Sequence, residues 1–167
     1  MLAAIPKTPL HARLNTEGRL DLNDEQTFGT NVIPLNMSRD ELRDGYIALM
    51  RDLYNPDSYF DRLESLYVTR KFDFGRARNA YLRAHPWRRR QAQLLDIGRA
   101  FGLFLLLMKN VPDSHLRQVY RRRMWRMLRS RPDPGVLFVS VVKCATHYHH
   151  YTMSREMSER RTLVNTF

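Results

Sequence analysis

The fold is decided by a stretch that reads PWRRRQAQLLDIGRAFGLFLLLMKNVPDSHLRQVYRRRMWRMLRSR, residues 86–131. Pro86 suits the first position of a helix, and apolar side chains then recur at three- and four-residue steps to about Met108. A tight turn at 111–113 separates this helix from a second one, which extends to about Arg131. Two long amphipathic helices joined by a short turn predict an all-α fold.

Further helix signals lie on both sides of this pair. Residues 38–41 read SRDE, a capping box that begins a helix, and Asn55 followed by Pro56 begins another. The segment from Val136 to about Arg160 starts with β-branched residues, so a strand is an alternative there, but its length and apolar spacing favour a helix. These signals predict a bundle of about five helices.

The first 36 residues differ from the rest, because they combine short apolar stretches with turn-rich polar segments. Gly18 has the position of a residue that ends a short helix. Such a segment cannot form a core alone, so the sequence predicts a non-autonomous irregular segment (1–36), a helical domain (37–161) and a tail (162–167). We expect the apolar stripes of the helices to be buried: Leu42, Tyr46, Leu49 and Leu53 near the start, and Leu94, Phe101, Leu105 and Met108 in the long helix.

Composition excludes several classes of protein. Of 167 residues, 43% are hydrophobic and 27% charged, which fits neither a disordered tail nor a membrane-embedded chain. The chain has a single cysteine and no glycine-rich phosphate-binding motif. The longest apolar run, residues 100–108, is far shorter than the roughly 20 residues of a membrane span. We therefore expect a cytoplasmic protein without a transmembrane segment.

The net charge of +11 is concentrated in one part of the chain. Residues 68–131 carry 17 Lys and Arg against three Asp and Glu, whereas residues 1–67 are acidic overall. Two arginine clusters are candidates for anion binding: Arg88, Arg89 and Arg90 on the first long helix, and Arg122, Arg126 and Arg129 on the second. The alternatives are a solvated basic face, or pairing of the first cluster with carboxylates such as Asp52, Asp57 or Asp61.

The long helix also contains a candidate apolar groove. Phe101, Phe104, Leu105 and Met108 make it apolar nearly all round, so these side chains either belong to the core or line a groove for a lipid tail. The two tryptophans, Trp87 and Trp125, are expected at the edges of the core.

A weak candidate for a metal site lies near the carboxyl end. Cys144, His147 and His150 are spaced so that they share one helical face. No further ligand is near them in the sequence. An aromatic packing face, continued by Tyr148 and Tyr151, is the alternative that the sequence favours.

Two sets of motifs resemble a known family. LAAIPKTPLHARL (2–14) with EGRL (17–20) looks like the end of a radical SAM barrel. TNVIP (30–34), MSRDEL (37–42) and LYNPDSYFDR (53–62) resemble the helical C-terminal extension, a domain of unknown function, of cobalamin-binding radical SAM proteins similar to hopanoid-biosynthesis enzymes. The resemblance implies a piece of such a protein: a split gene, an internal start, or a free-standing descendant of the extension.

The resemblance mainly implies which catalytic motifs and cofactor sites this chain lacks. The parent family uses SAM, an iron–sulfur cluster held by C-x-x-x-C-x-x-C, and cobalamin held by D-x-H-x-x-G. Here Cys144 stands alone, and the nearest cobalamin-like string, DSHLRQ (113–118), lacks the glycine and suits a helix start. We therefore expect no catalysis and none of these cofactors on this chain itself. Lys7 replaces the family's usual glycine, so we expect an ordinary backbone and an outward side chain there.

Two functions remain open from the sequence. The first is a non-catalytic accessory domain, which either packs on the barrel of a radical SAM core protein or holds an apolar, lipid-like substrate with an anionic head group. The second is a free-standing basic protein that binds nucleic acid or a membrane surface.

Overall fold

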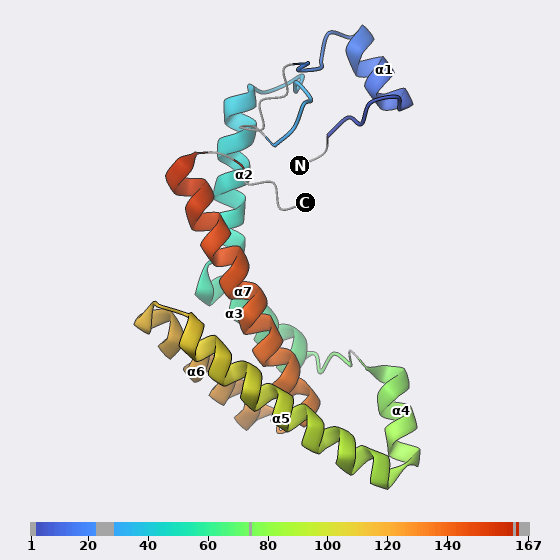
Figure 1. The fold of residues 1–167 in the computed structure, drawn as a ribbon, viewed down its shortest axis with the longest axis vertical. Coiled ribbons are helices and arrows are strands. Elements are labelled where there is room, and N and C mark those ends of the chain that lie inside the picture. Colours follow the sequence, from blue (N-terminus) through green and yellow to red (C-terminus); the bar gives the residue numbers. More distant parts are fainter. Residues whose placement is uncertain (1–2, 23–28, 74, 162, 164–167) are drawn as a thin grey trace. The chain divides into compact units, whose positions relative to one another are not determined.

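The structure is a computed structural model, and it describes residues 3–22, 29–73, 75–161 and 163. Within these residues the chain forms seven α-helices and no β-strand, which confirms the all-α prediction (Figure 1). The helices are α1 (Pro9–Thr16), α2 (Arg39–Leu53), α3 (Pro56–Glu64), α4 (Arg76–Ala84), α5 (Pro86–Asn110), α6 (Ser114–Ser130) and α7 (Pro134–Arg160), with a π-helical turn, Ser65–Thr69, after α3. The predicted tail lies outside the described residues except for Leu163.

Capping residues that are recognisable in the sequence begin three of the helices in the structure, and a glycine ends another. The Ser38 hydroxyl accepts a hydrogen bond from the Glu41 N–H at 3.1 Å, and the Glu41 carboxylate accepts one from the Ser38 N–H at 2.7 Å. Asn55 caps α3 and Asp113 caps α6 in the same way, through side-chain oxygens that accept from amides of the first turn. Gly18, with φ of 65°, ends α1 as expected.

The helix count exceeds the predicted five because two further short helices, α1 and α4, are present. α1 lies in the segment expected to be irregular, and α4 has no buried residue. The final segment is helical from Pro134, so its β-branched start does not form a strand. Asp133 begins this helix, since its side chain accepts from the Gly135 N–H at 2.8 Å.

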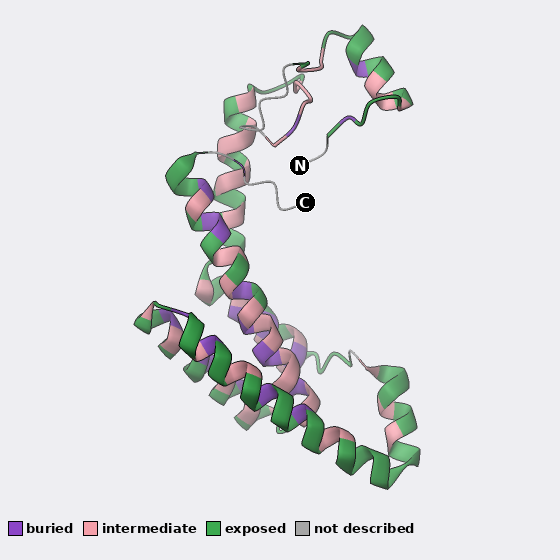
Figure 2. Ribbon diagram, in the orientation of Figure 1, coloured by how far each residue is buried: buried purple, intermediate pink, exposed green. Residues whose placement is uncertain are grey.

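The chain divides into two compact units, with α7 contributing residues to both. In the first, formed by residues 1–54 and 151–167, Met153, Met157 and Leu163 make a small core against Tyr46 and Ile47. The second unit, residues 55–150, holds most of the fully buried side chains. They include Phe60, Tyr120, Val136, Val141, Cys144 and His147 (Figure 2).

Two of the expected apolar stripes are not buried. On α2, Leu49 and Leu53 are exposed, and no residue of that helix is fully buried. On α5, the stripe that contains Leu94, Phe101 and Leu105 faces outward, while Asp96, Ala100 and Leu107 face the core. Periodicity identifies an apolar face but not what covers it, so the expectation of burial was wrong for these side chains.

Lys7 also differs from the expectation. Its side chain is exposed, as predicted, but its backbone has φ of 65°, in the left-handed region that favours glycine. The local geometry that a glycine would adopt is therefore kept here with a lysine in place.

Candidate functional site

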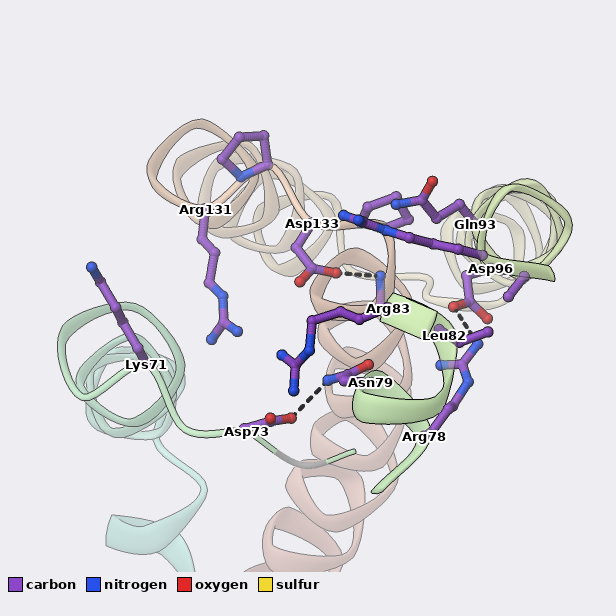
Figure 3. A pocket seen from close by; sticks show the side chains of 15 residues that line it. Lys71, Asp73, Arg78, Asn79, Leu82, Arg83, Gln93, Asp96, Arg131 and Asp133 are labelled. Carbon is purple, nitrogen blue, oxygen red and sulfur yellow. Dashed lines mark hydrogen bonds and ion pairs between the residues drawn. The ribbon is translucent and has the colours of Figure 1, made fainter. Parts of the chain in front are cut away.

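The second unit contains a pocket of about 420 Å³ that four segments enclose (Figure 3). They are the chain after the π-helical turn, α4, the first turns of α5, and the connection from α6 to α7. Five of its lining residues are basic, so we call this site the basic pocket. Its charged lining residues are Lys71, Asp73, Arg78, Arg83, Arg89, Asp96, Arg131 and Asp133.

The three carboxylates of the basic pocket are already engaged in holding the fold. Asp96 is buried on α5 and accepts a hydrogen bond from Arg78 of α4 at 2.8 Å. Asp73 accepts from the Asn79 side-chain amide at 2.7 Å. Asp133 accepts from the backbone N–H two residues later at the start of α7. Each of these carboxylates therefore already accepts a hydrogen bond from α4 or α7, and these contacts position α4, α5 and α7 around the pocket.

Most cations of the basic pocket have no carboxylate partner among the described residues. Within the described part of the chain, Lys71, Arg83 and Arg89 have neither an ion pair nor a side-chain hydrogen bond. Arg131 donates to two backbone carbonyls, at 2.9 and 3.3 Å, in and after the π-helical turn. The guanidinium groups of Arg83 and Arg131 point into the pocket (Figure 3). Their planar forks match carboxylate and phosphate oxygens, so the pocket suits an anion.

Of the first predicted arginine cluster, only Arg89 lines the basic pocket. All three arginines are exposed, and Arg88 and Arg90 lie about 100° away from Arg89 on either side of the helix. Antiparallel packing of the two long helices is expected to bring Arg131 near this run, and the pocket contains both Arg89 and Arg131. Sequence reasoning missed Lys71 and Arg83, which come from two other segments that only tertiary structure brings to the pocket.

The second predicted cluster lies on the outer face of α6. Arg122, Arg126 and Arg129 are all exposed, and Arg126 contacts the Glu64 carboxylate at 3.4 Å. None of the three lines the basic pocket. The two predicted clusters therefore do not form one site.

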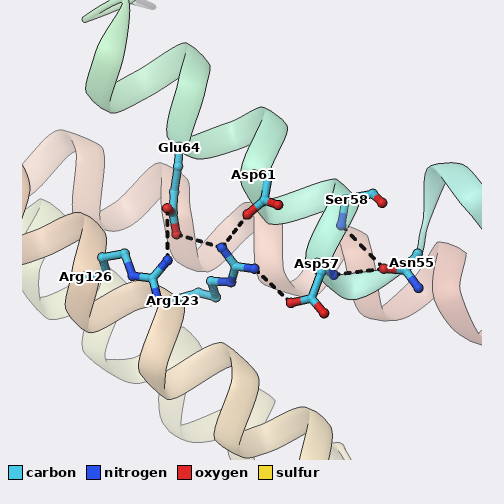
Figure 4. Close-up of polar contacts among 7 residues, drawn as sticks. All are labelled: Asn55, Asp57, Ser58, Asp61, Glu64, Arg123 and Arg126. Atoms are coloured by element: carbon cyan, nitrogen blue, oxygen red, sulfur yellow. Dashed lines mark hydrogen bonds and ion pairs between the residues drawn. The ribbon is translucent and has the colours of Figure 1, made fainter.

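A different arginine pairs with the acidic residues of α3. Arg123, although part of the Arg121–Arg123 run, is buried, and it donates to Asp61 at 2.6 Å, Asp57 at 2.8 Å and Glu64 at 3.2 Å (Figure 4). Burial alone lowers the pKa of the Arg123 guanidinium, but the three hydrogen bonds outweigh it and raise that pKa above its ordinary value. This network joins α3 to α6 and keeps Arg123 from binding a ligand.

The four residues predicted to line one apolar groove do not lie together in the structure. Phe104 of α5 lines an apolar hollow of about 330 Å³ with Met124, Trp125 and Leu128 of α6 and with Leu137 of α7. Phe101 and Leu105 instead face outward, and Met108 is half-buried. We call the cavity beside Phe104 the apolar hollow. Its full lining is Phe104, Arg121, Met124, Trp125, Leu128 and Leu137.

The two tryptophans are not core edges, contrary to expectation. Trp87 is 69% exposed and Trp125 is 66% exposed. Trp125 lines one side of the apolar hollow, yet most of its indole stays exposed, as does that of Trp87.

The residues of the weak metal candidate serve packing instead. His147 is fully buried, and a hydrogen bond of 2.7 Å joins its Nδ1 to the Tyr120 hydroxyl. Its ring packs against those of Tyr59 and Phe60. Burial raises the pKa of the Cys144 thiol to about 12, so the thiol stays protonated near neutral pH.

His150 lies three residues beyond His147 on α7. Burial, and secondarily the charge of His149, lowers the pKa of its imidazole. Among the described residues, no group of three or more His, Cys, Asp or Glu could hold a metal ion.

The family comparison covers most of the chain. Residues 8–162 match the family model described as a domain of unknown function, DUF4070. The chain belongs to this family. The matched range includes both pockets and every arginine discussed above. Neither the curated proteins nor the solved structures contain a match.

Proposed function

We propose that this DUF4070 chain is a non-catalytic binding domain that holds an amphiphilic ligand, with the anionic head group of the ligand in the basic pocket. The observation that carries the proposal is a set of three cations around one cavity, Lys71, Arg83 and Arg89, that have no ionic partner among the described residues. A protein gains little stability from bringing like charges together, so such a cluster favours an anionic ligand.

The chemistry of the pocket favours a phosphate or diphosphate group. Its carboxylates are occupied by internal hydrogen bonds, so its free hydrogen-bonding groups are predominantly donors. Its volume of about 420 Å³ falls within the range of small-molecule sites. Arginine forks bind the oxygens of phosphate in pairs.

The apolar hollow supports an apolar tail on the same ligand. It is lined by residues of α5, α6 and α7, and α5 and the start of α7 also line the basic pocket. Leu128 of the hollow lies on α6, and Arg131 of the pocket follows the end of that helix, three residues later in the chain. An isoprenoid-like phosphate combines the two chemistries that these neighbouring positions offer.

The resemblance to the C-terminal extension of cobalamin-binding radical SAM proteins extends this proposal. In that setting the domain would act in the cytoplasm beside a radical SAM core protein, and it would present the lipid-like substrate to that core. SAM, the iron–sulfur cluster and cobalamin would belong to the core protein and not to this chain.

The test is calorimetric titration with inorganic pyrophosphate and with a prenyl diphosphate. Arg83→Gln/Arg89→Gln removes two pocket cations, and Arg88→Gln/Arg90→Gln is the matched control, because it removes the same charge outside the pocket. We expect the first variant to weaken binding roughly ten- to a hundred-fold, since each charge-assisted hydrogen bond contributes about 1.5–3 kcal/mol before solvent exposure reduces it. The control should change binding less than about three-fold.

Two results would refute this proposal. One is an equal loss of affinity in both double variants, which would show a general electrostatic effect and no defined pocket. The other is the absence of pyrophosphate and prenyl diphosphate binding to the wild-type chain. Tighter binding of the prenyl compound than of pyrophosphate is the result expected if the apolar hollow takes the tail.

A second candidate function is nucleic-acid binding, and the exposure of Trp125 favours it. Arg122, Trp125 and Arg129 share the outer face of α6, and an exposed ring between arginines can stack on a base. If nucleic acid is the ligand, the logarithm of the affinity falls steeply and linearly with the logarithm of salt concentration. The absence of binding to single-stranded DNA and RNA at low salt would remove this candidate.

A further inference from the structure

The outward side of α5 is an uncovered apolar surface. Six large side chains there are each at least half exposed, and together we call them the α5 outer face: Trp87, Leu94, Leu95, Phe101, Leu105 and Leu106. The helical repeat brings four of them, Trp87, Leu94, Phe101 and Leu105, nearly into line. A side chain added at Gly98 or Gly102 on the same side would meet no described atom within 4 Å. Figure 2 shows this helix as largely exposed.

The length of the α5 outer face is unusual for a surface helix. By length and composition, α5 is the one described helix that could cross a membrane. Only 17% of its most apolar stretch of 18 residues is buried in the structure. From residue 87 to residue 106 the face extends over about 28 Å. An exposed apolar surface of this extent indicates an interaction site, since water-exposed faces of helices are normally polar.

The charges around the α5 outer face are of one sign. Arg88, Arg90, Arg99 and Lys109 are exposed on the same helix. The only carboxylate of α5, Asp96, is turned toward the core and paired with Arg78. The surface is therefore an apolar stripe bordered by cations, with no exposed carboxylate on the helix.

We propose that the α5 outer face binds to an anionic lipid surface, with the helix lying in the plane of the interface. The apolar side chains would enter the boundary between head groups and acyl chains, and the cations would meet lipid phosphates. The exposed indole of Trp87 suits this boundary, because it has an apolar body and a polar N–H.

Surface attachment fits α5 better than crossing the bilayer. Asp96 and Arg99 lie in the middle of the helix, and Asp96 is held by an ion pair to α4. A helix that crossed the membrane would carry these two charges into the hydrocarbon region. A helix that lies in the interface keeps Asp96 on the protein side.

Charge also argues against a second copy of the chain as the occupant. A symmetric pairing of two α5 outer faces would bring the arginines of one copy toward those of the other, with no exposed carboxylate on either α5 to offset them. An anionic membrane supplies the complementary charge, and each cation near such a surface strengthens binding by about five-fold.

The experiment is sedimentation of the full chain with vesicles of phosphatidylcholine containing 30% phosphatidylglycerol, compared with vesicles of phosphatidylcholine alone. We expect binding to the anionic vesicles and much weaker binding to the neutral ones. Leu94→Gln/Phe101→Gln should reduce binding roughly 30-fold or more, because two large apolar side chains no longer enter the interface. Leu35→Gln, which changes an equally exposed leucine outside α5, is the control and should bind as the wild type does.

A second measurement locates the contact. The chain has two tryptophans, so Trp125→Phe leaves Trp87 as the only indole reporter. Its emission should shift to the blue with anionic vesicles and be quenched by brominated lipid. Unchanged emission would overturn the proposal, even if Leu94→Gln/Phe101→Gln proved poorly folded.

Other outcomes also decide against the proposal. Failure of the wild-type chain to sediment with anionic vesicles overturns it. So does concentration-dependent dimerisation that Leu94→Gln/Phe101→Gln abolishes, because the face would then be an interface between copies. The basic pocket is tested separately, since Leu94→Gln/Phe101→Gln should leave the affinity for pyrophosphate unchanged.

Discussion

Replacing Arg123 by methionine should lower the free energy of unfolding by about 2–3 kcal/mol. The side chain is only 6% exposed, and it joins α6 to three carboxylates of α3 (Figure 4). Methionine retains most of the apolar stem, so the cavity left behind is small and the change mainly removes the ionic contacts.

The magnitude follows from the exposure of the three partners. Asp57 and Asp61 are 72% and 65% exposed, so water screens their contacts and each contributes at most about 1 kcal/mol. Glu64 is 21% exposed, and its contact at 3.2 Å is closer to a buried charge-assisted hydrogen bond of about 1.5 kcal/mol. After the variant is made, the carboxylates can hydrate, which keeps the loss below that of a fully buried ion pair.

The assay is urea unfolding followed by circular dichroism and by tryptophan fluorescence. Two probes are needed because the chain has two compact units, and coincident transitions are required before one free energy is assigned. Arg126→Met is the control, since Arg126 is 52% exposed and has one contact at 3.4 Å, and it should change stability by less than about 0.5 kcal/mol. Equal effects of the two variants, or no effect of Arg123→Met, would refute the reasoning.

Two other predictions concern single positions. Lys7→Gly should raise the free energy of unfolding by up to about 1 kcal/mol, because glycine tolerates the left-handed backbone at this position. A melting temperature of the variant below that of the wild-type chain would contradict this reasoning. Cys144 should not react with a thiol reagent at pH 8 in the folded chain, because the thiol is buried and burial raises its pKa to about 12. The thiol should react when denaturant is added. Rapid reaction without denaturant would contradict the prediction, because it would show that the site opens.

The helix starts could be predicted because their determinants are local. Ser38, Asn55 and Asp113 cap amides that lie two or three residues away, so a short window of sequence contains both donor and acceptor. The same holds for Gly18, whose freedom to adopt a positive φ ends α1. The interpretation of His147 as a packing residue rests on the aromatic residues that follow it in the sequence.

The basic pocket could be predicted only in part. The arginine run at 88–90 indicates an anion site, but it does not distinguish Arg89, which lines the pocket, from its neighbours, which do not. Lys71 and Arg83 carry no local signal that groups them with the arginine run. Their convergence depends on how α4, α5 and α6 pack.

The sequence by itself determined the helical class, the starts of the helices that have capping side chains and the location of the positive charge, because each depends on neighbouring residues or on composition. Tertiary structure alone decided which faces are covered. Arg123 is buried because carboxylates about 60 residues earlier in the chain reach it, whereas Phe101 is exposed because no described segment packs over it. Burial depends on contacts between residues distant in sequence, and helical periodicity does not contain that information.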